Sequence, residues 1–392
     1  MKASVFLEKF DAEKLGFISG VEDNKLLGNH IVQLQPYSMD DELSSADIAL
    51  IGVNEARHAL NNEGCEMAPN QIRKYLYNLT PVHKNLKIVD LGNIKQGAHL
   101  SDTYFALKAV VAELLLEDVI PIVIGGGQDL TYPIYLAFES LERIINLVAI
   151  DSRFDQVLNT EEPDSQSYLS HIIMRNPSFL FNYANIGYQT HFVNQDDLKL
   201  LDNLFFDAYR LGSVRSDLPE AEPILRNADM LTFDISAIRQ SDAPGNGNAS
   251  PNGFFGDEAC QLMRYAGLAE RLSCIGFFET NPLLDHNGQT VHLVAQLIWY
   301  FLEGFTLRSN DFPTEKSEGF IKYTATQPGL NNDMIFYKSK LTDRWWMQLP
   351  VSNDKADTLS RHVMIPCSYN DYLKAVKSEV PDRWWKAYQK LM

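Results

Sequence analysis

The chain has 392 residues, of which 45% are hydrophobic and 22% are charged, and its formal net charge at pH 7 is -17. The composition is that of a globular protein with a sizeable core, and an acidic balance without a long block of lysine and arginine excludes nucleic acid as a partner. No stretch approaches the roughly 20 apolar residues of a membrane span, so a membrane is excluded as well, and a cytoplasmic location is predicted.

After a mixed, polar arm at residues 1–45, short apolar runs alternate with helical patterns. The runs predicted as buried strands lie at residues 46–53, 87–92, 121–127, 146–151, 182–187, 208–212, 228–234 and 273–279. The predicted helices carry Ile72, Leu76 and Leu79 in one case and otherwise cover about 101–117, 131–143, 166–175, 256–271 and 290–304. This alternation predicts a three-layer α/β/α domain over residues 46–306 with an eight-stranded, mostly parallel sheet.

From residue 307 onward the pattern changes and predicts an extension, residues 307–392, that packs on the main domain. Residues 334–349 are typical of two strands joined by a tight turn, and residues 368–378 are typical of a helix with a Ser or Asn cap. The tetrapeptide Asp-Arg-Trp-Trp occurs at 343–346 and again at 382–385. These tryptophans are predicted to anchor the extension by packing, although a repeated aromatic pair that binds a ligand is the alternative.

Polar side chains follow three of the predicted strands at the point where each strand ends. The segments are residues 125–129 (GGGQD), 151–155 (DSRFD) and 232–236 (TFDIS). In an open parallel sheet, ligands bind beyond the carboxyl ends of the strands, so the three segments are expected to form one site. Their carboxylate, amide and hydroxyl oxygens are typical of a metal site, but Arg153 lies among them.

Seven segments in order resemble the ureohydrolase superfamily, which contains the arginases, agmatinases and formimidoylglutamases. They are IGV at 51–53, GCEMAPNQIRKYL at 64–76, VDLGNI at 89–94, IGGGQDLTYP at 124–133, AIDSRFD at 149–155, LTFDISAIRQSDAPG at 231–245 and FFETNPLLDHNGQTVHLVAQLIW at 277–299. The resemblance covers residues 46–306 and is strongest toward the formimidoylglutamase and agmatinase branches. It implies hydrolysis of an amidine or guanidine C–N bond, assisted by two Mn²⁺ ions.

Half of the ligand set that the resemblance implies is replaced in this chain. The family's two His positions and its last Asp position hold Gln128, Arg153 and Ser236, whereas the other three positions keep Asp151, Asp155 and Asp234. Glu279 matches the family carboxylate that pairs with the cationic amidine of the substrate. A binuclear manganese site is therefore not expected, because a guanidinium repels a nearby divalent cation and both nitrogen ligands are lost.

The main prediction from these residues is a pseudoenzyme with a degenerate metal site and no cofactor. Arg153 is expected to take the place of a metal by forking onto Asp151, Asp155 or Asp234. The protein would then act as a binding or regulatory protein, or as an altered enzyme. The ligand-binding residues would be Gln128, Asp151, Arg153, Asp155, Asp234, Ser236 and Glu279, and the ligand a small cationic guanidino or formimino compound.

Two alternatives stay open, and the position of Arg153 distinguishes them. If Arg153 points away, the oxygens of Gln128, Asp151, Asp155, Asp234 and Ser236 would hold one Mg²⁺, Ca²⁺ or Mn²⁺ ion. The chain would then be an active, formimidoylglutamase-like hydrolase of linear amidines, with Glu279 and Asp155 as catalytic candidates. If Arg153 lies against the aspartates, metal-free chemistry with a carboxylate base is the second alternative. The resemblance also implies a homo-oligomer, unless residues 310–392 cover the shared interface.

Overall fold

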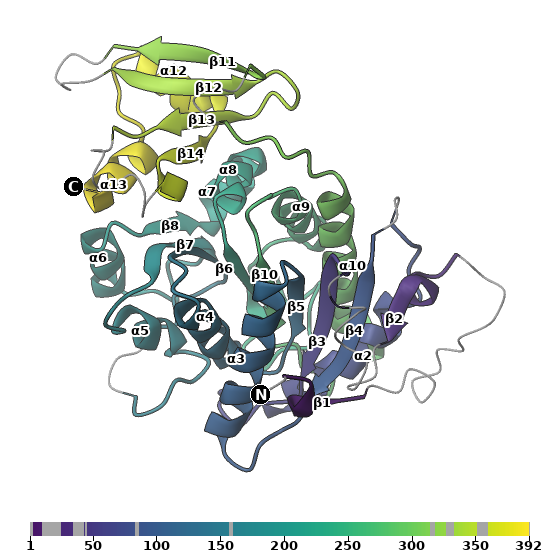
Figure 1. Ribbon diagram of the computed structural model, residues 1–392. Coiled ribbons are helices and arrows are strands. Elements are labelled where there is room, and N and C mark those ends of the chain that lie inside the picture. The colour runs from purple at the N-terminus through teal and green to yellow at the C-terminus, as the bar shows by residue number, and fades with distance from the viewer. Residues whose placement is uncertain are drawn as a thin grey trace.

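The computed structural model describes residues 3–9, 25–33, 43, 45–82, 86–156, 160–313, 318–326, 333–350 and 360–391. Figure 1 shows a large sheet between two layers of helices and a smaller sheet at one end of the molecule. The strands of the large sheet are β1 (Leu7–Glu8), β2 (Ile31–Gln33), β3 (Ile48–Val53), β4 (Ile88–Ile94), β5 (Ile120–Ile124), β6 (Ile145–Ile150), β7 (Leu180–Tyr188), β8 (Asp207–Arg210), β9 (Met230–Asp234) and β10 (Cys274–Phe278).

The strand order is β1-β4-β3-β5-β10-β9-β6-β7-β8, with β2 also paired to β4. All pairs are parallel except β1 with β4. The eight strands from β3 to β10 are those predicted from the sequence, so the α/β/α arrangement with a mostly parallel sheet is confirmed. The segment before residue 46 adds β1 and β2 at the edge of β4, where the sequence had predicted only an arm.

Helices cover both faces of the sheet because the strands are apolar on both faces. Ile48 and Leu50 of β3 belong to the core cluster shared with α2 (Ala68–Leu76), α9 (Gly256–Gly267) and α10 (Gln289–Thr306). Ala49 and Ile51 belong to the opposite cluster, shared with α3 (Leu100–Leu116), α4 (Thr131–Ser140) and α5 (Tyr168–Ile173). Three further helices are α6 (Gln195–Asn203), α7 (Leu211–Ser216) and α8 (Glu222–Arg226), which the sequence did not predict.

The described residues after α10 include a four-stranded antiparallel sheet and two helices. Its order is β11 (Phe320–Ala325), β12 (Met334–Ser339), β13 (Trp345–Gln348) and β14 (Met364–Cys367), and the helices are α12 (Tyr369–Val376) and α13 (Asp382–Leu391). The predicted strand pair at 334–349 and the helix capped by Ser368 are both present. The division of the chain into an arm, a domain and an extension at residues 45 and 306 stays a prediction.

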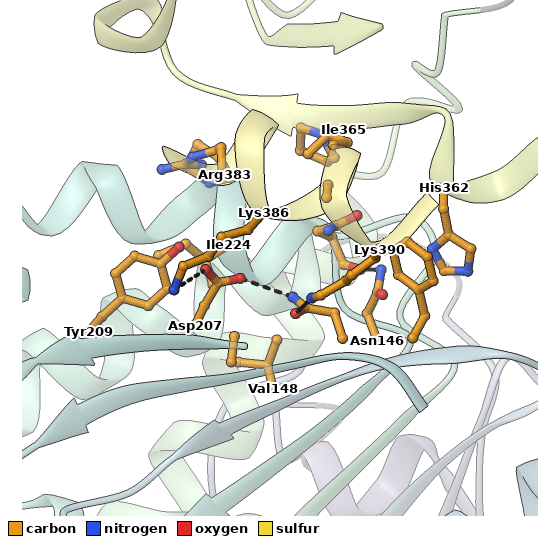
Figure 2. Close-up of a pocket in the computed structure, with 17 residues that line it drawn as sticks. Asn146, Val148, Asp207, Tyr209, Ile224, His362, Ile365, Arg383, Lys386 and Lys390 are labelled. Carbon is orange, nitrogen blue, oxygen red and sulfur yellow. Dashed lines mark hydrogen bonds and ion pairs between the residues drawn. The ribbon is translucent and has the colours of Figure 1, made fainter. Parts of the chain in front are cut away.

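Figure 1 shows the extension beside α8 and β8. Aromatic and cationic side chains make the contact. Trp346 is 1% exposed and lies under the guanidinium of Arg226, whose Nη2 donates to the carbonyl of Trp345 at 3.1 Å. Figure 2 shows Lys386 and Lys390 of α13 beside Asp207 of β8, around a cavity of about 40 Å³. Packing therefore accounts for the first Trp pair. In the second pair Trp384 is buried, whereas Trp385 is 44% exposed.

None of the helices in the described part of the chain combines the length and the hydropathy that a membrane span requires.

Candidate metal centre

Four neighbouring strands carry the predicted site residues at their carboxyl ends. The strands β5, β10, β9 and β6 are adjacent in the sheet, and the segments that follow them meet in one place. Gln128, after β5, donates its backbone N–H to Oε1 of Glu279, after β10, at 2.8 Å, and its side-chain amide to the hydroxyl of Thr232 in β9 at 2.7 Å. The ends of these strands therefore meet, as the topology rule predicts for a parallel sheet.

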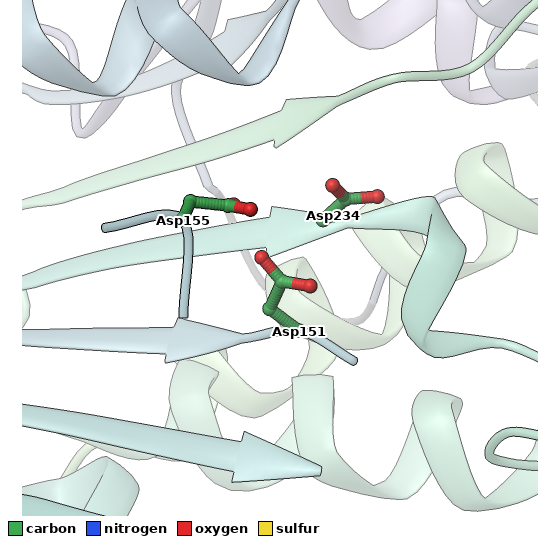
Figure 3. A group of neighbouring side chains, drawn as sticks. All are labelled: Asp151, Asp155 and Asp234. Carbon is green, nitrogen blue, oxygen red and sulfur yellow. The ribbon is translucent and has the colours of Figure 1, made fainter. Parts of the chain in front are cut away.

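Asp151, Asp155 and Asp234 form a cluster of buried carboxylates at the centre of this crevice. One oxygen from each lies within 4.8 Å of the others, and Figure 3 shows the three side chains converging from the ends of β6 and β9. The residues are 1%, 7% and 7% exposed, respectively. Two of them are fixed by the chain that follows, because the backbone N–H of Arg153 donates to Asp151 at 2.9 Å and that of Ser236 donates to Asp234 at 2.6 Å.

The electrostatics of the cluster favour a bound cation. Burial raises the pKa of Asp151, Asp155 and Asp234, and the charge of Asp151 raises the pKa of Asp155 and Asp234 further. In the described structure Oδ2 of Asp151, Oδ2 of Asp155 and Oε1 of Gln128 are buried without a hydrogen-bond partner. Buried oxygens of this kind cost free energy unless a donor or a cation satisfies them, so the residues present fit one oxygen-liganded divalent ion.

The side chain of Arg153 does not lie among the aspartates. Its guanidinium carbon is 4.3 Å from the centroid of the Phe192 ring, and none of the ion pairs between described residues joins it to Asp151, Asp155 or Asp234. Its carbonyl is held by the side-chain amide of Asn185 at 2.6 Å. The prediction that Arg153 replaces a metal by forking onto the carboxylates is therefore wrong. The aromatic face of Phe192 holds the guanidinium by a cation–π contact outside the cluster.

The other two replaced positions, Gln128 and Ser236, are neutral and lie beside the cluster. The hydroxyl of Ser236 is 3.2 Å from that of Ser152. The amide nitrogen of Gln128 donates a hydrogen bond to Thr232, which leaves the amide oxygen available as a neutral ligand for a metal ion. The structure thus brings together three carboxylates and two neutral side chains with oxygen atoms. The guanidinium of Arg153, which was predicted to lie among them, lies over Phe192.

Glu279 is a further buried acid of the site, and its orientation is fixed by hydrogen bonds. Its backbone has a φ of 65°, in the left-handed region, and its Oε2 accepts from the side-chain amide of Asn62 at 2.7 Å. The same amide and that of Asn246 donate to the Glu279 carbonyl. Burial raises the pKa of Glu279 to about 8, against the lowering effect of the hydrogen bonds from Gln128 and Asn62. Glu279 can therefore gain or lose a proton near neutral pH.

Two residues that position this site were missed in the sequence. Asn62 lies in the loop after β3, and no pattern marks it there. Asp129 directly follows Gln128 and accepts from the hydroxyl of Tyr104 at 2.6 Å, and burial raises its pKa to about 7. Its position in the Gly-rich segment was the available signal for Asp129.

Comparison with known proteins places these features in a family. The sequence model of the arginase family matches residues 46–303. The chain is similar to the formimidoylglutamase of Corynebacterium efficiens, with 28% identity over 283 residues that cover 68% of this chain and 87% of that protein. A second relative, the formimidoylglutamase of Lysinibacillus sphaericus, is 24% identical over 279 residues, which are 68% of this chain and 87% of that protein.

Solved structures have the same fold. Formiminoglutamase from Trypanosoma cruzi with Mn²⁺ has a TM-score of 0.64 and 22% identity, over 70% of this chain and 97% of that chain. Formimidoylglutamase from Bacillus subtilis has a TM-score of 0.66 and 19% identity, over 76% and 98% of the two chains.

The prediction that the chain has no cofactor is wrong. The similar Trypanosoma cruzi protein is described with Mn²⁺, the family match spans the whole crevice, and the three buried aspartates gather as metal ligands do. The error arose because the charge count from the sequence placed the Arg153 guanidinium inside the cluster, whereas it lies over Phe192. A metal cofactor is expected. Because the family model matches well over half of the residues, with the ligand-bearing strands included, the chain belongs to the arginase family.

Proposed function

We propose that this chain is a formimidoylglutamase-like hydrolase that cleaves a C–N bond of a linear amidine and uses one divalent ion at Asp151, Asp155 and Asp234. The observation that carries the proposal is the buried cluster of three carboxylates, with unpaired oxygens and with no cationic side chain from the described residues among them. The similarity to formimidoylglutamases over 68% of the chain supports the choice of reaction. The arrangement favours the active alternative over a binding or regulatory protein, since Arg153 lies outside the cluster.

One ion, and not two, is proposed because of the donor set. Three carboxylates balance one divalent charge with one negative charge to spare, but they do not balance two such ions. The donors are all oxygens, with Oε1 of Gln128 as a neutral fourth candidate, and hard ions such as Mg²⁺, Ca²⁺ and Mn²⁺ prefer oxygen ligands. When bound, such an ion would supply Lewis-acid activation of water for attack on the amidine carbon.

The protein's own residues would bind the substrate and move protons. Glu279 offers a carboxylate that Asn62 and the backbone of Gln128 hold in one orientation, and it would pair with the amidinium group of the substrate. Because burial raises its pKa, Glu279 can also take up a proton from the amidinium group and pass it to the leaving amine. The depth of the cluster excludes bulk water from the reacting group.

The test combines metal content with turnover of the purified chain. After incubation with Mn²⁺ and removal of excess metal, about one equivalent should remain, and formiminoglutamate should release formamide only in the metal-loaded sample. The variant Asp234→Asn should lose both. Asp196→Asn, on the exposed surface of α6, is the matched control that removes the same charge and should retain both. Formamide release that is unchanged in Asp234→Asn would assign the reaction to another site.

A further inference from the structure

A second, cation-lined hollow lies at the opposite end of the sheet from the aspartate cluster. It has a volume of about 430 Å³ and lies where the strands β6, β9 and β10 begin. Its walls include Arg143 from the segment after α4, Arg271 from the segment before β10, and Arg361 and His362 from the extension. The hollow is thus built jointly by the arginase-like sheet and by residues outside the family match.

The positive charges in this hollow exceed the negative charges that satisfy them. Arg361 forms an ion pair with Asp229, whose other oxygen already accepts from the backbone of Asn146 at 2.8 Å. Among the ion pairs between described residues, none includes Arg143 or Arg271. The remaining acid of the lining, Glu142, is exposed. Arg361 and Arg271 therefore share the buried carboxylate of Asp229, and Arg143 adds a third positive charge, in a protein with a net charge of -17.

Two of these arginines are held in place before any ligand arrives. The guanidinium carbon of Arg271 lies 3.8 Å from the centroid of the Phe312 ring, and its Nη1 donates to the carbonyl of Arg361 at 3.3 Å. Nη2 of Arg143 donates to the carbonyl of Leu115 at 3.1 Å. Holding the guanidinium groups in fixed positions reduces the entropy lost on binding, and each still has free N–H donors.

We propose that this hollow is a binding site for a small metabolite that carries a phosphate or carboxylate group. The planar fork of arginine matches the paired oxygens of both groups, and like charges that line one hollow repel until an anion bridges them. Burial and the neighbouring charge of Arg361 lower the pKa of Arg271 to about 10, in agreement with this repulsion. A volume of about 430 Å³ lies within the range of small-molecule sites.

The proposed anion site is separate from the metal centre. Asp229 precedes β9 and Asp234 ends it, and Ile145 begins β6 while Asp151 follows its last residue. The anion would thus bind at the amino ends of the two strands whose carboxyl ends carry the aspartates. Binding should not compete with a substrate in the crevice, and the proposal does not depend on the proposed hydrolysis.

The experiment is isothermal titration of the metal-free full-length chain with pyrophosphate and, separately, with succinate, at constant ionic strength. Working without metal prevents chelation from producing heat at the aspartate cluster. We expect saturable binding at one site for at least one probe. Tighter binding of pyrophosphate would identify a phosphate ligand, and tighter binding of succinate would identify a carboxylate ligand.

Variants of the lining arginines test whether the binding heat comes from this hollow. Arg143→Gln removes a charge, and Arg271→Lys keeps the charge but removes the fork. Each should weaken binding at least tenfold with an unchanged circular dichroism spectrum. Lys377→Gln, at an exposed position after α12, removes one charge elsewhere and should leave the affinity within twofold. The proposal is overturned if neither probe gives saturable heat, or if both arginine variants bind as tightly as the unmodified chain.

Discussion

The guanidinium carbon of Arg153 lies 4.3 Å from the centroid of the Phe192 ring, on the rim of the crevice and outside the aspartate cluster. Arg153 occupies a position where the family resemblance implies a histidine ligand, yet only its backbone N–H contacts Asp151. Within the described residues the side chain therefore forms no ion pair with the three carboxylates, although its charge partly offsets the rise in the pKa of Asp151 that burial causes. This single orientation changes the interpretation of the site from a cation-filled pocket to a place for a metal ion.

The orientation predicts that removing the Arg153 side chain has little effect on the fold. Arg153→Met should lower the free energy of unfolding by less than about 1 kcal/mol, the usual size of a partly exposed cation–π contact. Metal affinity should stay the same or rise, because one positive charge near Asp151 is lost.

Arg73→Met is the contrasting variant. Arg73 is fully buried and binds both oxygens of Asp90, at 2.7 and 2.9 Å, so its loss should cost about 3–5 kcal/mol. A large loss of stability with Arg153→Met would contradict this orientation and would indicate that the guanidinium pairs with the aspartates.

The replaced ligand positions predict how a second ion could be restored. Combining Gln128→His, Arg153→His and Ser236→Asp supplies the two imidazoles and the fourth carboxylate that the family resemblance implies. Elemental analysis should then give about two equivalents of Mn²⁺ where the unmodified chain gives about one. Ser236→Ala is the control and should keep one. If the triple variant still holds a single equivalent, then features beyond the ligands prevent a second ion.

The buried acids predict a pH dependence of stability in the metal-free chain. The folded pKa values of Asp129, about 7, and Glu279, about 8, lie above the ordinary values of 3.8 and 4.5. Between these values the folded state binds more protons than the unfolded state, so stability falls as the pH rises. Each group contributes up to about 1.4 kcal/mol per pH unit.

Urea unfolding in EDTA between about pH 5.5 and pH 7.5 would measure this slope. Lys390, whose pKa is lowered to about 8, titrates above this range, but burial also lowers the pKa of His362 far below its ordinary 6.5. His362 therefore acts with the opposite sign below about pH 6.5, and the slope is taken above that pH. Asp129→Asn keeps the shape of the side chain and should reduce the slope. Added Mn²⁺ should raise stability most at the upper end of the range. A stability that rises with pH in the metal-free chain would contradict the buried, uncompensated state of these acids.

The two Asp-Arg-Trp-Trp segments provide a matched pair of variants for the extension. Trp346→Ala removes a buried ring that contacts Arg226 and should cost about 3–5 kcal/mol. Trp385→Ala changes a ring that is 44% exposed and should cost less than about 1 kcal/mol. Thermal and urea unfolding would compare the two. Equal losses would point to a ligand or partner bound at Trp385.

The fold was largely predictable because buried parallel strands are nearly continuous apolar runs. The run before Gly125 and the run before Asp151 became β5 and β6 in full. The edge strands β1 and β2 were missed because two or three residues carry no pattern. Helix α7 was missed because it begins at Leu211, directly after β8, within residues that were predicted to continue the strand.

At the site, the positions of the residues at the strand ends were predictable, but Asn62 and the direction of the Arg153 side chain were not. Strand ends placed Gln128, Asp151 and Asp234 together, since the backbone topology alone determines that. The direction of Arg153 depends on Phe192, which lies after the next strand, β7, and only the folded loops bring the two together. The arginines of the second hollow come from three distant segments, so no local pattern could have grouped them.

The five residues of β9 connect the arginine-lined hollow with the aspartate cluster. Asp229 lies just before this strand and Asp234 is its last residue. Leu231 and Phe233 face one helical layer and Met230 faces the other. A single-residue insertion or deletion in β9 would exchange these faces and displace one of the two aspartates. Length variation is therefore expected to be tolerated in the connecting loops and not in this strand, so the spacing between the two sites should stay constant while their linings diverge.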